Sequence, residues 1–264
     1  MTRLAIGLCV VLVAAAAAPA QDWAKARLEK SPRHGEWVVL KHDHRAVQAF
    51  VTFPEVKDKA TAVVVIHEIF GLTDWVRLVT DQLAEAGYIA IAPDLLSGAN
   101  GKAGTAELGG GDAVRKAIMS LPPAQVTADL TAAADYVAKL PACNGKVAVA
   151  GFCWGGGQSF RFATANKNLK AAFVFYGPGP DEAGVARIAC PVYGFYGGND
   201  ARINMTVPKT AELMKKAGKT YESVTYEGAG HGFMRAGDAP GASDANRKAK
   251  DEAWKRWKEL LEKL

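Results

Sequence analysis

Three side chains in this sequence could together carry out nucleophilic catalysis: Cys153, Asp200 and His231. A cysteine attacks a carbonyl carbon once a histidine has taken its proton, and an aspartate orients that histidine and stabilises its charged form. The three occur in the order nucleophile, acid, histidine, and each follows a predicted strand. This order is typical of enzymes whose nucleophile lies on a sharp strand–helix turn. The pattern predicts acyl transfer through a thioester.

Cys153 lies in a segment that reads Gly-Phe-Cys-Trp-Gly-Gly, at positions 151–156. Small or β-branched apolar residues precede it as a buried strand, and positions 158–165 follow as a helix. Glycines beside the nucleophile permit a turn in which a Cβ atom would collide with neighbouring backbone. The turn places Cys153 at a helix N-terminus, where the thiolate is favoured. Taken alone, the motif also fits an ordinary turn that buries a free cysteine.

The two proposed partners of Cys153 lie in tight turns at the ends of later strands. His231 is surrounded by glycines and has little to pack against, which argues against a structural role. Asp200 follows Gly-Gly-Asn, and its alternative role is to cap a helix that begins near position 203. The oxyanion would be bound by the backbone N–H of Trp154 and by that of Ile69, in the loop after another strand.

Together these segments resemble the dienelactone hydrolase family of α/β-hydrolases. The matching segments are His-Glu-Ile-Phe-Gly at 67–71, Pro-Asp-Leu at 93–95, Gly-Phe-Cys-Trp-Gly-Gly at 151–156 and Gly-His-Gly-Phe at 230–233. The resemblance covers positions 63–233 and implies an α/β-hydrolase fold without a large cap domain. It implies hydrolysis of a small-molecule ester or lactone, and we expect neither a cofactor nor a metal ion.

The resemblance also assigns roles to residues around the nucleophile. It implies that Glu68 holds the resting thiol of Cys153 until substrate binding displaces the carboxylate. A carboxylate beside a thiol opposes its ionisation, and a protonated thiol oxidises slowly. The alternative for Glu68 is a solvated loop carboxylate. Arg235 and Tyr176 are the candidates for substrate binding.

Arg235 matches one of two arginines that bind the substrate carboxylate in this family. The second is missing, because the chain reads Leu-Leu-Ser-Gly at positions 95–98. A less charged ester or lactone therefore fits this sequence better than a dienelactone. Arg77 also matches a family position, and we expect it to pair with a carboxylate such as Glu68.

Hydrophobic patterning predicts the elements that position these residues. Predicted strands occupy 37–41, 47–53, 61–66, 88–92, 146–152, 171–176, 192–196 and 220–226, and predicted helices occupy 75–86, 113–120, 123–140, 158–165, 205–217 and 243–264. The alternation predicts a single α/β domain over 21–264, with a mostly parallel sheet flanked by helices. Catalytic groups then gather beyond the C-terminal ends of the strands.

Three other segments receive specific interpretations. Positions 22–32 are polar and predict a loosely docked arm, and positions 97–111 hold six glycines and predict a long loop. The first two strands form an antiparallel edge pair joined through His42-Asp43-His44. Two histidines at this spacing could bind metal, but no third ligand is near, so a solvated turn is favoured.

Composition and the N-terminus limit the setting in which the protein works. The chain has 264 residues and a net charge of +5, and its basic residues are scattered, which argues against nucleic-acid binding. Positions 1–20 read as a signal peptide, so we expect a secreted or periplasmic monomer with no membrane attachment after cleavage. Cys143 and Cys190 could form a disulfide, but we expect both to be free and buried, with a strand between them.

Two other classes of function fit the same residues. An acyltransferase or peptidase would use the same triad and differ only in acceptor or leaving group. An exported scaffold that binds a ligand without turnover is the second alternative, and an intact triad argues against it. Activity measured before and after thiol alkylation separates these hypotheses.

Overall fold

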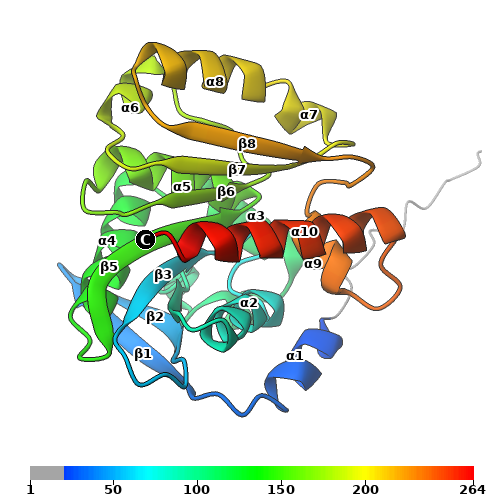
Figure 1. Ribbon diagram of the computed structural model, residues 1–264. Coiled ribbons are helices and arrows are strands. Elements are labelled where there is room, and N and C mark those ends of the chain that lie inside the picture. The colour runs from blue at the N-terminus through cyan, green and yellow to red at the C-terminus, as the bar shows by residue number, and fades with distance from the viewer. Residues whose placement is uncertain (1–20) are drawn as a thin grey trace, which may run out of the picture.

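The computed structural model describes residues 21–264, and the predicted signal peptide lies outside them. Eight strands form one sheet in the order β1-β2-β4-β3-β5-β6-β7-β8 (Figure 1). The strands are β1 (Gly35–His42), β2 (Arg45–Thr52), β3 (Ala60–Ile66), β4 (Ile89–Pro93), β5 (Cys143–Phe152), β6 (Ala172–Phe175), β7 (Val192–Gly197) and β8 (Tyr221–Tyr226). Only β1–β2 and β2–β4 are antiparallel pairs. The predicted α/β class with a mostly parallel sheet is therefore confirmed.

Helices cover both faces of this sheet. One core layer receives side chains from α1 (Asp22–Leu28), α2 (Asp74–Glu85), α9 (Phe233–Asp238) and α10 (Asp244–Leu261). The opposite layer receives them from α4 (Pro123–Ala138), α5 (Trp154–Ala165), α6 (Glu182–Arg187) and α8 (Val207–Lys216). In Figure 1, α10 crosses in front of the sheet, and α4 and α5 lie behind it. The remaining helices, α3 (Gly111–Met119) and α7 (Ala201–Asn204), are short.

The buried strands explain why the sheet is parallel at its centre. All seven residues of β3 are buried, and so are the last six of β5. Strands without a polar face need helices on both sides, and crossover helices supply them in parallel sheets. The last helix packs against this sheet, because Trp257 and Leu261 are buried in the core.

The N-terminal segment differs from the prediction of a loose arm. Residues of this segment form α1, and Ala24 is completely buried in the same core layer as α2. The side-chain oxygen of Gln21 accepts a hydrogen bond of 3.0 Å from the backbone N–H of Trp75, in the first turn of α2. A short, largely polar helix gives almost no periodic signal, because it docks through the buried Ala24, the partly buried Trp23 and Leu28, and one amide.

The glycine-rich loop at 97–111 contains two single 3₁₀ turns, η1 (Ala99–Gly101) and η2 (Thr105–Glu107). It is irregular, as predicted, but it is anchored from inside by Asp94. The Asp94 carboxylate accepts hydrogen bonds from the backbone of Leu96 and from the backbone and hydroxyl of Thr105. The Thr105 hydroxyl oxygen in turn accepts from the backbone N–H of Leu72. This chain of hydrogen bonds ties the loop to the segment that follows β3.

Cys143 and Cys190 are free and buried, as predicted, and β6 lies between the strands that adjoin them. Across residues 21–264, no helix is both long enough and apolar enough to span a membrane.

Candidate active site

Cys153 lies on the turn between β5 and α5. Its backbone has φ +56° and ψ −117°, in a region that L-residues rarely adopt, and its N–H donates to Phe175 O at 3.1 Å. Flanking glycines make the turn possible: a Cβ on Gly151 would lie 1.9 Å from Gly155 O, and one on Gly155 would lie 2.4 Å from His67 O. The structure therefore has the geometry of the predicted nucleophile turn, and the strain is local to the reactive residue.

His231 and Asp200 lie together at the ends of β8 and β7. The Nδ1 atom of His231 is 2.5 Å from Asp200 Oδ2, and the Asp200 side chain is 5% exposed. The other carboxylate oxygen, Oδ1, accepts from the backbone N–H of Ile203 at 3.3 Å and so caps α7. Asp200 can therefore bind His231 and cap α7 at the same time, because each carboxylate oxygen has its own donor.

The electrostatics link His231 to the cysteine. Burial lowers the pKa of His231, but hydrogen bonds to Cys153 and Asp200 and the charges of both groups raise it to about 9. Since Nδ1 bonds to the aspartate, the opposite ring nitrogen is left to face the sulfur. The structure therefore brings together the three residues that the sequence singled out.

Glu68 lies next to this group and is almost completely buried. Its Oε2 accepts a hydrogen bond of 2.6 Å from Arg235 Nε, and the guanidinium lies 5.1 Å from the centre of the Phe70 ring. Burial raises the pKa of Glu68, and the charges of Arg235 and His231 oppose that rise. Glu68 is therefore not a solvated loop carboxylate.

Arg77 pairs with a carboxylate, as expected, but that carboxylate is not Glu68. Arg77 binds Asp74, three residues earlier on α2, and its guanidinium lies over the rings of Trp37 and Phe50 at 5.7 and 5.4 Å. These rings are on β1 and β2, so the side chain points to the edge of the sheet. The partner of Glu68 is instead Arg235, which is 167 positions away in the sequence.

Tyr176 follows β6 and also lies within the site. Its backbone has φ +41°, its side chain is completely buried, and its ring lies 5.1 Å from that of His231 in an edge-to-face arrangement. Burial raises the pKa of Tyr176 well above its ordinary value, and the nearby charges of Glu68 and Cys153 add to this. Its hydroxyl has no hydrogen-bond partner among residues 21–264.

The two backbone groups predicted to bind an oxyanion are free to do so. Neither the N–H of Ile69 nor that of Trp154 donates to a protein acceptor within the described part of the chain. For Trp154 this follows from its position at the start of α5, where N–H groups have no partner within the helix.

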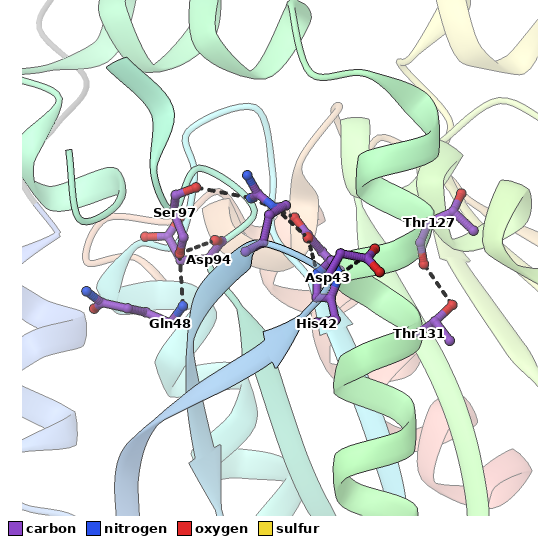
Figure 2. Close-up of polar contacts among 9 residues, drawn as sticks. His42, Asp43, Gln48, Asp94, Ser97, Thr127 and Thr131 are labelled. Carbon is purple, nitrogen blue, oxygen red and sulfur yellow. Dashed lines mark hydrogen bonds and ion pairs between the residues drawn. The ribbon is translucent and has the colours of Figure 1, made fainter. Parts of the chain in front are cut away.

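The histidines of the β1–β2 turn do not form a metal site. His42 Nε2 donates to the buried carboxylate of Asp129 at 2.6 Å, and Arg45 binds the same carboxylate at 2.9 and 3.0 Å. Figure 2 shows His42 at the end of its strand and, nearby, the hydrogen bond that the backbone N–H of Gln48 donates to the Ser97 hydroxyl. Among the described residues, no three His, Cys, Asp or Glu side chains are grouped as metal ligands. The turn is solvated at Asp43 and His44, as the sequence favoured, whereas His42 is held by the buried carboxylate of Asp129.

Sequence reasoning missed His67, which it treated only as part of a motif. This histidine is completely buried at the end of β3, and its ring stacks on Trp154 with centres 5.6 Å apart and planes 14° apart. The sequence feature that could have identified His67 is a polar residue directly after a fully apolar strand.

Comparison with known proteins gives a consistent result. The family model described as "Dienelactone hydrolase family" matches residues 47–264. A protein of Salmonella typhimurium whose name assigns it to the carboxymethylenebutenolidases is 32% identical over 79% of this chain and 79% of its own length. A protein of Saccharolobus solfataricus with the same assignment is 30% identical over 84% of this chain and 96% of its own.

Solved structures agree with the sequence comparisons. A Klebsiella pneumoniae protein, whose title assigns it to the dienelactone hydrolases, superposes with a TM-score of 0.77. It is 27% identical, and the match covers 88% of this chain and 99% of that one.

Proposed function

Because the chain belongs to the dienelactone hydrolase family and is a carboxylic ester or lactone hydrolase, we propose that Cys153, His231 and Asp200 are its catalytic triad. One observation carries the proposal. His231 is bound through Nδ1 to a buried aspartate, while its pKa responds to the sulfur of a cysteine that lies on a strained strand–helix turn. A nucleophile, a base and a residue that orients the base thereby meet at one edge of the sheet.

The reaction follows from these contacts. His231 takes the thiol proton, and the Cys153 sulfur attacks the carbonyl carbon, so that the carbonyl electron pair moves to oxygen. The N–H groups of Ile69 and Trp154 bind this oxyanion. The oxyanion collapses, the ester C–O bond breaks, and His231 gives its proton to the departing alkoxide. A thioester remains. Water then loses a proton to His231 and attacks the thioester, which releases the carboxylic acid and restores the thiol.

Glu68 modulates the thiol in this proposal. A buried carboxylate near sulfur opposes formation of a second negative charge, and Arg235 offsets part of that effect. A substrate that displaces the Glu68 carboxylate removes this opposition and lets the thiolate of Cys153 form. This links substrate binding to ionisation of the nucleophile.

The site also favours a weakly charged substrate. Arg235 is already paired with Glu68, and the loop that follows Asp94 contributes no second arginine. A substrate dianion or a strongly held carboxylate would have to compete with Glu68 for one guanidinium. We therefore propose a neutral or singly charged small ester or lactone, with Arg235 and Tyr176 lining its binding site.

Replacement of the nucleophile tests the function directly. Cys153→Ala should reduce hydrolysis of short p-nitrophenyl esters and aryl lactones by a factor of at least about 10³, since no other residue can form the acyl-enzyme. Wild-type enzyme quenched during turnover should carry an acyl group on Cys153, detectable by peptide mass spectrometry. Cys190→Ala is the matched control, because it removes a buried thiol outside the site and should keep wild-type turnover.

Unchanged hydrolysis by Cys153→Ala would refute the triad. Acyl transfer to added alcohols or amines in preference to water would instead favour an acyltransferase.

We also propose that the protein is exported, as the sequence at positions 1–20 predicts. Expression of the full chain in a Gram-negative host, followed by fractionation and N-terminal sequencing, tests this. A mature protein that begins near position 21 in the periplasm supports export, and an intact N-terminus in the cytoplasm contradicts it.

A further inference from the structure

We propose that His67 is a positioning residue that fixes both N–H donors of the oxyanion hole. This inference rests on the proposed function, because it concerns the same thioester-forming step. His67 does not touch the reacting atoms in this arrangement. It acts through the two residues that do, Ile69 and Trp154.

The first contact sets the direction of the Ile69 N–H. His67 Nδ1 donates to the carbonyl oxygen of Glu68 at 2.8 Å, and the N–H of Gly71 donates to the same oxygen at 3.1 Å. The peptide bond between Glu68 and Ile69 is trans, so its C=O and N–H point in opposite directions. A carbonyl held on the His67 side therefore points the Ile69 N–H in the opposite direction, away from His67. That N–H, like the N–H of Trp154, has no protein acceptor in residues 21–264.

The second contact sets the position of the Trp154 N–H. The imidazole stacks on the Trp154 indole, with centres 5.6 Å apart and planes nearly parallel at 14°. The backbone of His67 lies against the same turn, since a Cβ on Gly155 would be 2.4 Å from His67 O. Both the side chain and the main chain of His67 thus contact the start of α5, where the Trp154 N–H lies.

The chemistry of the imidazole suits this role. A carbonyl oxygen can only accept, so Nδ1 carries the proton. Burial lowers the pKa of His67, with the charge of Asp94 opposing it, and the ring stays neutral at physiological pH. The Nε2 atom has no partner within the described chain, so this ring makes a single directional hydrogen bond. That bond is the one to Glu68 O.

Three variants separate the two contacts. His67→Phe keeps a flat ring for stacking but loses the donor, and His67→Asn keeps a donor near the Nδ1 position but loses the ring. His42→Asn is the matched control, because it alters a hydrogen-bonded histidine outside the site. We expect His67→Phe to lower kcat for p-nitrophenyl ester hydrolysis about 10²-fold with little change in KM. Relative to His67→Phe, His67→Asn should recover part of this loss, and His42→Asn should keep wild-type kcat.

Alkylation by iodoacetamide distinguishes positioning from general disruption. Iodoacetamide reacts at a saturated carbon and forms no oxyanion, so its rate reports the nucleophile alone. We expect His67→Phe to alkylate at Cys153 with a rate within about twofold of wild type, while ester hydrolysis falls as stated. The far-ultraviolet circular dichroism and melting temperature of each variant show whether it is folded.

Three outcomes would overturn the inference. Ester hydrolysis by His67→Phe at the wild-type rate would show that the donors do not depend on His67. Equal loss of hydrolysis and alkylation would show that the substitution disrupts the nucleophile instead. Wild-type hydrolysis by His67→Asn would show that the stacked ring does not position the Trp154 N–H, so that His67 does not fix both donors. Failure of the proposed function is recognised separately, because hydrolysis would then persist in Cys153→Ala.

Discussion

Two histidine–aspartate pairs lie at opposite sides of the sheet, one beside β1 and the other beside β7 and β8, and they differ in what surrounds them. His231 and Asp200 are joined at 2.5 Å, and His42 and Asp129 at 2.6 Å, with a buried carboxylate in both cases. Asp129 also binds the guanidinium of Arg45 through both oxygens. Within residues 21–264, Asp200 has no arginine partner, and its second oxygen accepts only a backbone N–H.

The comparison shows that a histidine–carboxylate contact does not by itself make a catalytic pair. The free side of the His42 ring faces Asp43, a carboxylate exposed to solvent, at 3.5 Å. The free side of His231 faces Cys153, which raises the pKa of the imidazole. The His231 ring has a nucleophile on one side and an uncompensated carboxylate on the other. These two features distinguish it from the His42 ring. Two predictions test this distinction.

The larger effect is expected from exchanging the aspartates for asparagine. Asp200→Asn should lower kcat by roughly 10³–10⁴, because an amide can present its N–H to His231 and favour the wrong tautomer. The folded state should change little, since an asparagine can still cap α7. Steady-state kinetics with a p-nitrophenyl ester and urea unfolding of the same samples provide both readouts.

Asp129→Asn is the matched change at the other pair and should give the reverse result. The positive charge of Arg45 loses its partner, so we expect a loss of about 2–4 kcal/mol in the free energy of unfolding. Its kcat should remain within about threefold of wild type, a range expected for sites that do not contact the reacting atoms. A large loss of kcat without a loss of stability would contradict the distinction.

A smaller effect is expected in the titration of His231. Burial alone would lower its pKa, but the hydrogen bond to Cys153 is the largest of the causes that raise it to about 9. Cys153→Ala should therefore shift the His231 midpoint downwards in an NMR titration of the imidazole resonances. A midpoint that is the same in wild type and variant would show that the sulfur does not contact the ring.

The same pKa predicts how stability depends on pH. The pKa of His231 is higher in the folded protein than the value of about 6.5 in an unfolded chain, so the protonated form is bound more tightly in the fold. Its contribution to the free energy of unfolding is complete below about pH 6.5 and is lost as the pH rises through 9.

The sequence predicted those parts of the site that depend on local backbone. Cys153, Asp200 and His231 follow strands and lie in glycine-rich turns, and both features are visible within a few residues of each. The partner of Glu68 was predicted wrongly because the choice between Arg77 and Arg235 depends on which way each helix faces. That direction is set by the packing of α2 and α9 on the sheet, which local patterning does not determine.

The same limit applies to the fold. The positions of the strands and of the long helices along the chain follow from periodicity, and these predictions are confirmed. The docking of α1 and the ion pair of Asp129 with Arg45 depend on contacts between residues far apart in the sequence. His67 belongs to this second group, because its role depends on a peptide plane and a ring supplied by two different loops.

The burial of Cys143 and Cys190, on either side of β6, also makes it possible to measure how much of a preparation has a reactive Cys153. Both thiols are buried, and burial raises the pKa of Cys190 to about 11, whereas Cys153 is partly open to solvent. Of the three cysteines in the described chain, one is therefore addressable by a soluble electrophile. An excess of labelled alkylating reagent therefore labels Cys153 selectively, and the stoichiometry of its incorporation gives the fraction of molecules with a reactive Cys153 in any preparation.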